Sequence, residues 1–169
     1  MSFILACPIG DKKVDANIAR ANAGWTLFFA LISIFMLFNY TGPTFLNINW
    51  VSGILFFIVC FLAFDFWARF KCSKLSLIAI INKLIIYNVL GFKNRFINAE
   101  PKRFAAKLGF LMTITTIVFL LLAFLLSNLT LIYFGKIVLI LLIIASSLEF
   151  FLDFCVGCFL YSLLMQKNK

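Results

Sequence analysis

The sequence has no histidine and few charged residues, and these two absences exclude several classes of protein. Without histidine, the chain cannot supply a histidine general base, a histidine ligand to haem or a zinc site that depends on histidine. Only 12% of its 169 residues are charged, whereas about a quarter are charged in a soluble domain. Hydrophobic residues make up 64% of the chain and include 23 Phe. This composition excludes a soluble globular domain and indicates an integral membrane protein.

Four long apolar runs predict a single all-α membrane domain that occupies the whole chain, residues 1–169. A helix needs about 20 apolar residues to cross a bilayer, and such runs occur at residues 21–40, 48–67, 108–127 and 131–164. The last run is longer than a bilayer requires, so this helix is expected to tilt or to extend past the membrane. The predicted fold is a bundle of four transmembrane helices plus an interfacial amphipathic helix in the central loop.

The interfacial helix is predicted from a fifth apolar stretch, residues 75–92. Asn82 and Lys83 lie in its middle, where a lysine at the bilayer centre would cost roughly 2.5–3.5 kcal/mol. A helix that lies in the interface avoids this cost, because its polar side chains stay in contact with water. A fifth transmembrane helix is the alternative that this stretch leaves open.

The distribution of Lys and Arg predicts the orientation of the chain in the membrane. Of the 15 Lys and Arg residues, all except Lys136 lie in the N-terminal segment, the long central loop or the C-terminal tail. Because positively charged loops stay in the cytoplasm, both termini and the central loop are expected there. Anionic lipid then accounts for the formal net charge of +9, and no nucleic-acid partner is required.

Acidic residues lie in or beside the predicted spans. Asp65 and Arg69 are four residues apart near the end of the second span, so they share a helix face and can form an ion pair. We interpret this pair as an interfacial anchor, with Arg69 extended toward water; a functional role is the alternative. Glu149 and Asp153 are also four apart, and two neighbouring carboxylates in lipid need a proton or a cation. The cations available near helix ends are Arg20, Lys102, Arg103 and Lys107.

The sharpest local motif is Cys155-Val156-Gly157-Cys158. Two cysteines one helical turn apart can bridge with little backbone movement, which permits thiol–disulfide exchange, and they can also form half of a soft-metal site. Within a continuous last span the pair lies near the helix C-terminus, where the dipole disfavours a thiolate. A reactive pair would therefore need a nearby cation or a break in the helix at Gly157. Packing of two unreactive cysteines is the alternative.

Cys7, which precedes a proline, is the third part of the predicted thiol site. The N-terminal segment and the end of the last span are both expected on the cytoplasmic side, so Cys7 can reach Cys155 or Cys158 there. The five cysteines do not indicate a disulfide framework, because their number is odd and most lie in or beside apolar spans. Cys60 is interpreted as a packing residue, and no partner is evident for Cys72.

Four segments of the chain carry motifs that together resemble one protein family. They are Cys7-Pro8 with residues 15–23, residues 65–69, residues 101–109, and residues 149–161 with the Cys-x-x-Cys motif. The chain is thereby similar to a family of small bacterial four-helix integral membrane proteins that is defined only as a domain of unknown function. The resemblance implies a location in the bacterial inner membrane. It also implies that the positions of interest are Cys7, Asp65, Arg69, Lys102, Arg103, Glu149, Cys155 and Cys158.

Three functions remain open at this point. The first is a membrane thiol–disulfide redox protein, in which Cys155, Cys158 and Cys7 exchange electrons with a thioredoxin-like protein or a quinone. The second is a carrier of a small sulfur species or a soft metal ion, coupled to protons through Glu149 and Asp153; a four-span carrier would be expected to form a homodimer. The third is a non-catalytic membrane subunit. We adopt the redox hypothesis, assign no resident cofactor or metal, and leave open whether the chain is an enzyme.

Overall fold

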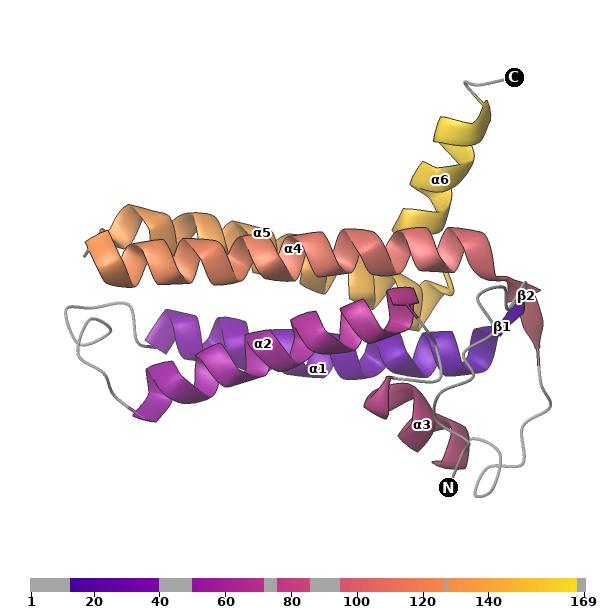
Figure 1. Ribbon diagram of the computed structural model, residues 1–169, viewed down its shortest axis with the longest axis horizontal. Helices are drawn as coiled ribbons and strands as arrows, with labels where there is room; N and C mark the ends of the chain where they lie inside the picture. The colour runs from indigo at the N-terminus through magenta and orange to yellow at the C-terminus, as the bar shows by residue number, and fades with distance from the viewer. Residues whose placement is uncertain (1–12, 40–49, 72–75, 86–94, 127, 167–169) are drawn as a thin grey trace.

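The computed structural model describes residues 13–39, 50–71, 76–85, 95–126 and 128–166. Figure 1 shows a bundle of long helices with two short helices outside it. In chain order the elements are β1 (Lys13–Asp15), α1 (Ala16–Asn39), α2 (Trp50–Lys71), α3 (Leu77–Leu84), β2 (Phe96–Asn98), α4 (Ala99–Leu126), α5 (Leu129–Leu152) and α6 (Val156–Gln166).

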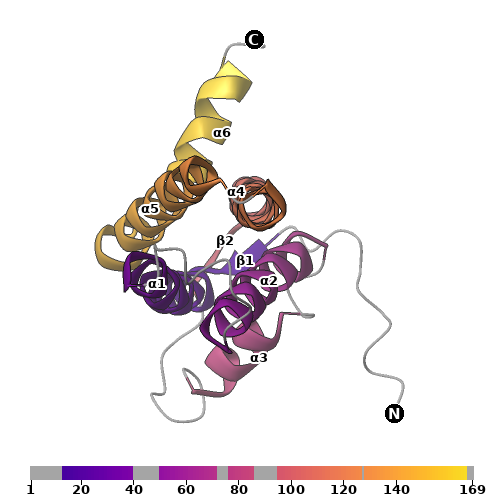
Figure 2. The same cartoon turned by 90° about the vertical axis from the view of Figure 1, so that its left-hand side faces the viewer.

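The bundle consists of α1, α2, α4 and α5, which in the described part of the chain are the helices long and apolar enough to cross a membrane. α4 packs against α2 and α5, and α1 packs against the same two helices, so the four enclose one core (Figure 2). The outward side chains of Phe35, Phe57 and Leu125 are 68–73% exposed. Large apolar side chains around the whole outside require lipid as the solvent. The chain is therefore an all-α multi-pass membrane protein, as the sequence predicts.

Small residues bring the bundle helices close together. A methyl group on Gly109 of α4 would overlap the ring of Phe66 on α2, and one on Gly24 of α1 would lie 2.8 Å from the ring of Phe150 on α5. Membrane helices gain no hydrophobic free energy by leaving lipid for each other, so close backbone approach is what stabilises their contact. Glycine at these two positions leaves room for an aromatic ring from the facing helix.

The predicted last span, residues 131–164, is two helices in the structure. α5 ends at Leu152, and α6 begins at Val156. Between them, Asp153 has φ 54° and ψ 21°, a left-handed conformation that ends many helices and that Asp tolerates better than most residues. The N–H groups of Asp153 and Phe154 both donate to the Leu148 carbonyl and close the last turn of α5. Hydropathy predicts one helix here because it measures apolar character and not backbone direction.

The other three long helices begin or end outside the predicted apolar runs. α1 begins at residue 16 instead of 21, α2 ends at residue 71 instead of 67, and α4 begins at residue 99 instead of 108. A helix satisfies its own backbone hydrogen bonds, so it can continue past the membrane with polar side chains. The added turns carry much of the polar chemistry, including Arg69 and Lys102.

A short antiparallel ladder joins the starts of α1 and α4 at one end of the bundle (Figure 1). β1 pairs with β2 so that Val14 lies opposite Ile97, and the N–H of Ala16 donates to the Arg95 carbonyl at 2.7 Å. Each strand is only three residues long and leads directly into a long helix. The ladder therefore fixes the two helix starts relative to each other.

α3 occupies the first half of the predicted interfacial segment, residues 75–92. The Ser76 hydroxyl accepts a hydrogen bond from the Ala79 N–H and caps the helix start. Asn82 is buried against the bundle, whereas Leu77 and Leu84 are more than half exposed. The helix is present as predicted, and its buried side carries Asn82 together with Ile78 and Ala79. Residues 86–94 lie outside the described part of the chain.

Candidate functional site

The candidate site lies where α5 ends and α6 begins. The last carbonyls of α5 lack partners within the helix, and Arg20 of α1 supplies two. Its Nε donates to the Phe150 carbonyl at 2.7 Å and its Nη2 to the Phe151 carbonyl at 3.3 Å. Arg95 forms an ion pair with Asp153 at 3.2 Å. Two arginines that are distant in sequence thus stabilise the break in the helix.

The break places the two cysteines at the start of α6. Cys155 precedes the helix directly, and its carbonyl accepts the first helical hydrogen bond, from the Phe159 N–H at 3.0 Å. Cys158 follows within the first turn. The sequence predicts Cys155 and Cys158 near the C-terminus of a continuous span, and this prediction is wrong: they lie at the N-terminus of α6. There the helix dipole stabilises a thiolate instead of destabilising it.

Lys102 and Glu149 form an ion pair beside the thiols. The Lys102 Nζ of α4 donates to the Glu149 Oε1 of α5 at 2.5 Å, and the two side chains are 14% and 20% exposed. The charges of both residues act on Cys155 and on Cys158. The sequence predicts that Glu149 needs a cation and names Lys102 among four candidates, so the structure selects one of them.

Glu149 and Asp153 do not form the acid pair that their spacing predicts. The left-handed turn at Asp153 removes this residue from the face of α5 that carries Glu149. Asp153 lies at the surface with Arg95, and Glu149 lies inside with Lys102. Each carboxylate therefore has its own cation.

The two thiols differ in acidity. A hydrogen bond from the Cys158 thiol lowers the pKa of Cys155, and the charge of Lys102 lowers it further; burial and the Glu149 carboxylate act in the opposite direction. The pKa of Cys158 is raised, first by the same hydrogen bond and then by burial and the negative charge of Cys155. Cys155 is therefore the thiol of the pair that ionises first. Its side chain is buried, with the residue 9% exposed, whereas Cys158 is half-buried.

Close contact with α4 holds α6 in place. A methyl group on Gly157 would lie 2.5 Å from the Cβ and 2.6 Å from the Cα of Ala105, so only glycine fits without moving the backbone. One turn later, the Tyr161 hydroxyl donates to the Glu100 carboxylate at 3.0 Å, and its ring lies 5.7 Å from that of Phe104. α6 is thus fixed to the same turns of α4 that carry Lys102.

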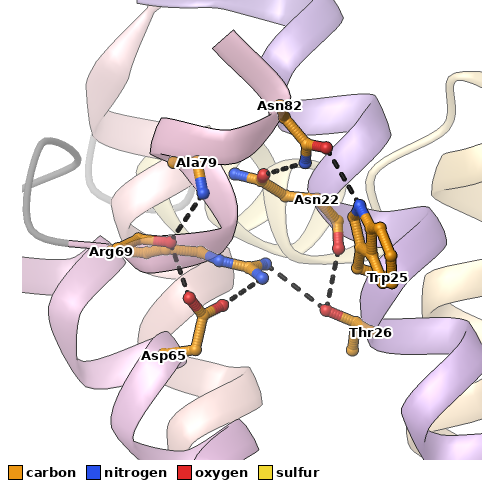
Figure 3. A network of polar contacts seen from close by, with 8 residues as sticks. Asn22, Trp25, Thr26, Asp65, Arg69, Ala79 and Asn82 are labelled. Carbon is orange, nitrogen blue, oxygen red and sulfur yellow. Dashed lines mark hydrogen bonds and ion pairs between the residues drawn. The ribbon is translucent and has the colours of Figure 1, made fainter. Parts of the chain in front are cut away.

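A second polar cluster lies where α3 packs against α1 and α2 of the bundle (Figure 3). Asp65 and Arg69 of α2 form an ion pair, and their side chains are 2% and 14% exposed. Asp65 accepts a hydrogen bond from the Ser76 hydroxyl at 2.6 Å, and Arg69 Nη1 donates to the Thr26 hydroxyl at 3.4 Å. The ion pair forms as predicted, but Arg69 extends into the bundle and not outward toward water.

Asparagine side chains continue this cluster from α1 to α3. The Asn82 side-chain amide donates to the Asn22 side-chain oxygen at 2.6 Å, and the Trp25 indole donates to the Asn82 side-chain oxygen at 2.9 Å (Figure 3). The Thr26 hydroxyl donates to the Asn22 backbone carbonyl at 3.0 Å. These bonds explain why the polar Asn82 of α3 faces inward, because its partners lie on α1.

The two clusters are in electrostatic contact, because the charge of Glu149 acts on Arg69 as well as on the thiols.

Residues 14–166 match a domain of unknown function, DUF4395. The chain belongs to this family. The match contains both polar clusters, the Cys-x-x-Cys motif and all four long helices, whereas Cys7 precedes it. No curated protein and no solved structure matches the chain.

The other cysteines of the chain, and Arg103, lie apart from the Cys-x-x-Cys pair or outside the described residues. Cys7 and Cys72 lie outside the described residues, so the predicted contact of Cys7 with the pair stays a prediction. Cys60 is half-buried in α2, and Arg103 is half-buried on α4. In the part of the chain that the structure describes, no three Cys, Asp or Glu side chains converge as metal ligands would.

Sequence reasoning missed several polar residues of this domain. Asn22, Trp25, Thr26 and Ser76 do not stand out in the sequence, and Asn82 stands out only as an interruption of an apolar stretch. A usable signal was present: Asn22 and Thr26 are one turn apart on a largely apolar helix, a spacing that places both on one face. Their partners, however, lie on α2 and α3, and no local pattern connects those segments.

Proposed function

We propose that the chain is a membrane thiol–disulfide redox protein in which Cys155 is the attacking thiol and Cys158 the resolving thiol. The observation that carries the proposal is the position of the pair in the first turn of α6, beside the ammonium group of Lys102. A helix N-terminus and a cation both favour a thiolate, and the thiolate is the nucleophile in exchange. The hydrogen bond from Cys158 favours the Cys155 thiolate further.

The proposed reaction transfers two electrons. The Cys155 thiolate attacks one sulfur of a partner disulfide, the partner S–S bond breaks, and a mixed disulfide forms with release of a partner thiolate. Cys158 then loses its proton and attacks the Cys155 sulfur. The mixed disulfide breaks, the second partner thiolate leaves, and an intramolecular Cys155–Cys158 disulfide remains. The partner disulfide is reduced to a dithiol, and the two thiol protons of the chain go to the two partner thiolates.

The partner proposed for this step is a thioredoxin-like disulfide protein on the cytoplasmic side of a bacterial inner membrane. The excess of Lys and Arg at the end of the bundle that carries the thiols supports that orientation. A membrane quinone is the alternative electron acceptor. Because Cys155 is buried, a partner sulfur reaches it only when α6 moves away from α4, and the contact that opens is Gly157 against Ala105.

The carrier hypothesis has less support. It requires a polar route from Glu149 to the opposite end of the bundle. The buried hydroxyls on the way belong to Ser33, Thr113, Thr116 and Ser146, and each donates to a carbonyl of its own helix. Their hydrogen atoms are therefore already used within the helices, as is common for such residues in apolar helices.

Thiol trapping tests the proposal. Cells that express the full chain are treated with a mild oxidant, quenched in acid, and alkylated with a reagent that adds a fixed mass to each free thiol. We expect the wild type to lose two labels reversibly, and Cys155→Ser and Cys158→Ser each to abolish this paired loss. Cys60→Ser is the matched control, because Cys60 lies on α2, and it should retain the paired loss.

Two further outcomes are informative. In Cys158→Ser the Cys155 thiol cannot be resolved, so a mixed disulfide with the partner should accumulate and can be identified by mass spectrometry. If Cys155 and Cys158 keep both labels under every oxidising condition, the redox proposal is wrong. If the paired loss instead requires Cys7 and persists without Cys158, the resolving thiol is Cys7.

A further inference from the structure

α6 extends outward from the bundle instead of running along it. In Figure 1 the four long helices lie roughly parallel, and α6 leaves them at a steep angle close to the end that carries β1 and β2. Figure 2 looks along the bundle and shows α6 directed outward from it. A helix at a steep angle to the axis of a transmembrane bundle runs closer to the membrane plane than to the membrane normal.

One side of α6 is covered by α4, and another is apolar and uncovered. Gly157 and Tyr161 contact α4. The uncovered side carries Phe159, Leu160, Leu163 and Leu164, which are 40–56% exposed. Ser162 lies between the two on the helix surface and is also exposed. α6 has no charged residue of its own, so its uncovered apolar side favours the acyl chains at the membrane boundary over water.

We propose that α6 is an in-plane interfacial helix whose Phe159, Leu160, Leu163 and Leu164 side chains are inserted among the acyl chains of a bilayer that contains anionic lipid. The apolar surface of α6 continues that at the end of α5, where Phe151 and Leu152 of α5 and Phe154 of the break are 45–69% exposed, and the Phe154 ring lies 5.8 Å from that of Phe159 on α6. Because the α5 surface faces lipid, the same lipid covers α6 without any change of solvent along the chain.

α3 supports the assignment from the other side of the bundle. It lies at the same end as α6, on the opposite side of the four long helices (Figures 1 and 2). Its Leu77, Ile80 and Leu84 are 45–55% exposed. Two short helices with outward apolar side chains at one level mark the depth of an interface. Exposed cations lie at this end of the bundle and complement anionic headgroups: Arg20, Lys71, Lys83, Arg95 and Lys107.

Photo-crosslinking tests this position and does not depend on the thiol chemistry. The full chain is prepared with p-benzoylphenylalanine at Leu163, or at Ser162 as the matched control, in nanodiscs of phosphatidylcholine and phosphatidylglycerol. After irradiation, intact-mass spectrometry counts lipid adducts and chain–chain adducts. We expect several-fold more lipid adduct at Leu163 than at Ser162.

Two results would overturn the proposal. A chain–chain adduct as the main product at Leu163 would make α6 an interface between two copies. Equal and low lipid labelling at both positions would place α6 in water. The photoreactive residue at Leu160 provides a second apolar position, so a folding failure of the Leu163 variant does not prevent the comparison; the lipid adduct is expected there too.

Discussion

At Asp153 one residue decides whether the end of the chain is one helix or two. Its left-handed backbone directs the chain away from α5, and the Arg20 and Arg95 side chains stabilise the resulting helix ends. Because of this turn, the cysteines come after a helix break and next to Lys102, and not on the side of a continuous span. The reactivity of the pair therefore depends on a backbone conformation at a residue that is not itself a thiol.

We predict that Asp153→Val destabilises the protein by about 1–2 kcal/mol, because a β-branched residue is strained in the left-handed region. Asp153→Gly, which adopts this conformation without a Cβ clash, is the matched control and should stay much closer to the wild type. The free energies of unfolding are measured in mixed micelles by circular dichroism. Equal stability of the two variants would show that residue 153 does not keep the left-handed turn.

Lys102 is predicted to make the Cys155 thiol more acidic, in addition to the effect of the hydrogen bond from Cys158. Its positive charge lowers the pKa of the Cys155 thiol, so in Lys102→Met that pKa rises and less thiolate is present at any pH below it. We expect the pH profile of Cys155 alkylation to move to higher pH, with alkylation at neutral pH slowed several-fold. Peptide-resolved iodoacetamide labelling measures the rates. Lys102→Arg keeps the charge and should keep the profile, and an unchanged profile in Lys102→Met would contradict the assignment.

At the scale of secondary-structure elements, packing of α6 on α4 limits access to the thiols. In Gly157→Ala the new methyl group collides with the Ala105 backbone, which cannot move away as a flexible side chain could. We predict that α6 separates from α4 and that Cys155 and Cys158 are alkylated faster. Gly53→Ala is the matched control, because among the described residues no atom beyond the neighbouring backbone of α2 lies within 4 Å of a methyl group at that position. Slower or unchanged labelling in Gly157→Ala would contradict the packing shown here.

The ion pair between Asp65 and Arg69 is predicted to hold α3 on the bundle through Ser76. Arg69→Met leaves the Asp65 carboxylate buried without a cation, which costs about 3–5 kcal/mol. The double variant Asp65→Leu/Arg69→Met removes both charges and should regain much of that loss. Unfolding monitored by tryptophan fluorescence measures the difference. If the single and double variants are equally stable, the two charges do not interact inside the bundle.

At the scale of the whole molecule, charge and polar chemistry gather at one end of the bundle. The starts of α1 and α4, the ends of α2 and α5, and the short elements β1, β2, α3 and α6 all lie there (Figure 1). In the described opposite half, Lys136 is the one Lys or Arg, and its ammonium group lies over the rings of Phe38 and Tyr133. This asymmetry gives the molecule a defined direction across a membrane.

We predict that this charged end faces the cytoplasm. Green fluorescent protein fused to the C-terminus should fluoresce, because it folds in the cytoplasm. Alkaline phosphatase inserted between α1 and α2 should be active, because it folds only on the other side of the membrane. The reverse pattern of both reporters would invert the orientation and place the thiols on the outer side.

Much of the fold could be predicted from the sequence, and part of the site could. The four apolar runs correctly indicate four bundle helices, because the free energy of helix insertion into lipid depends on local composition. The i, i+4 spacing of Asp65 and Arg69 correctly indicates an ion pair, because both residues lie on one helix. The same spacing fails for Glu149 and Asp153, because it assumes a helix that continues through Asp153.

The sequence by itself determined that this chain crosses a membrane, where its long apolar helices lie, and which residues carry thiols and charges. These properties follow from composition and from periodicity within one segment. Only the tertiary structure decided that Glu149 pairs with Lys102, that Arg69 points into the bundle, and that Cys155 directly precedes a new helix. Each of these depends on groups that are distant in the chain, such as Arg20 on the carbonyls of α5 and Ala105 against Gly157. Contacts of that kind form only when the packed helices bring those groups together, so no local pattern in the sequence encodes them.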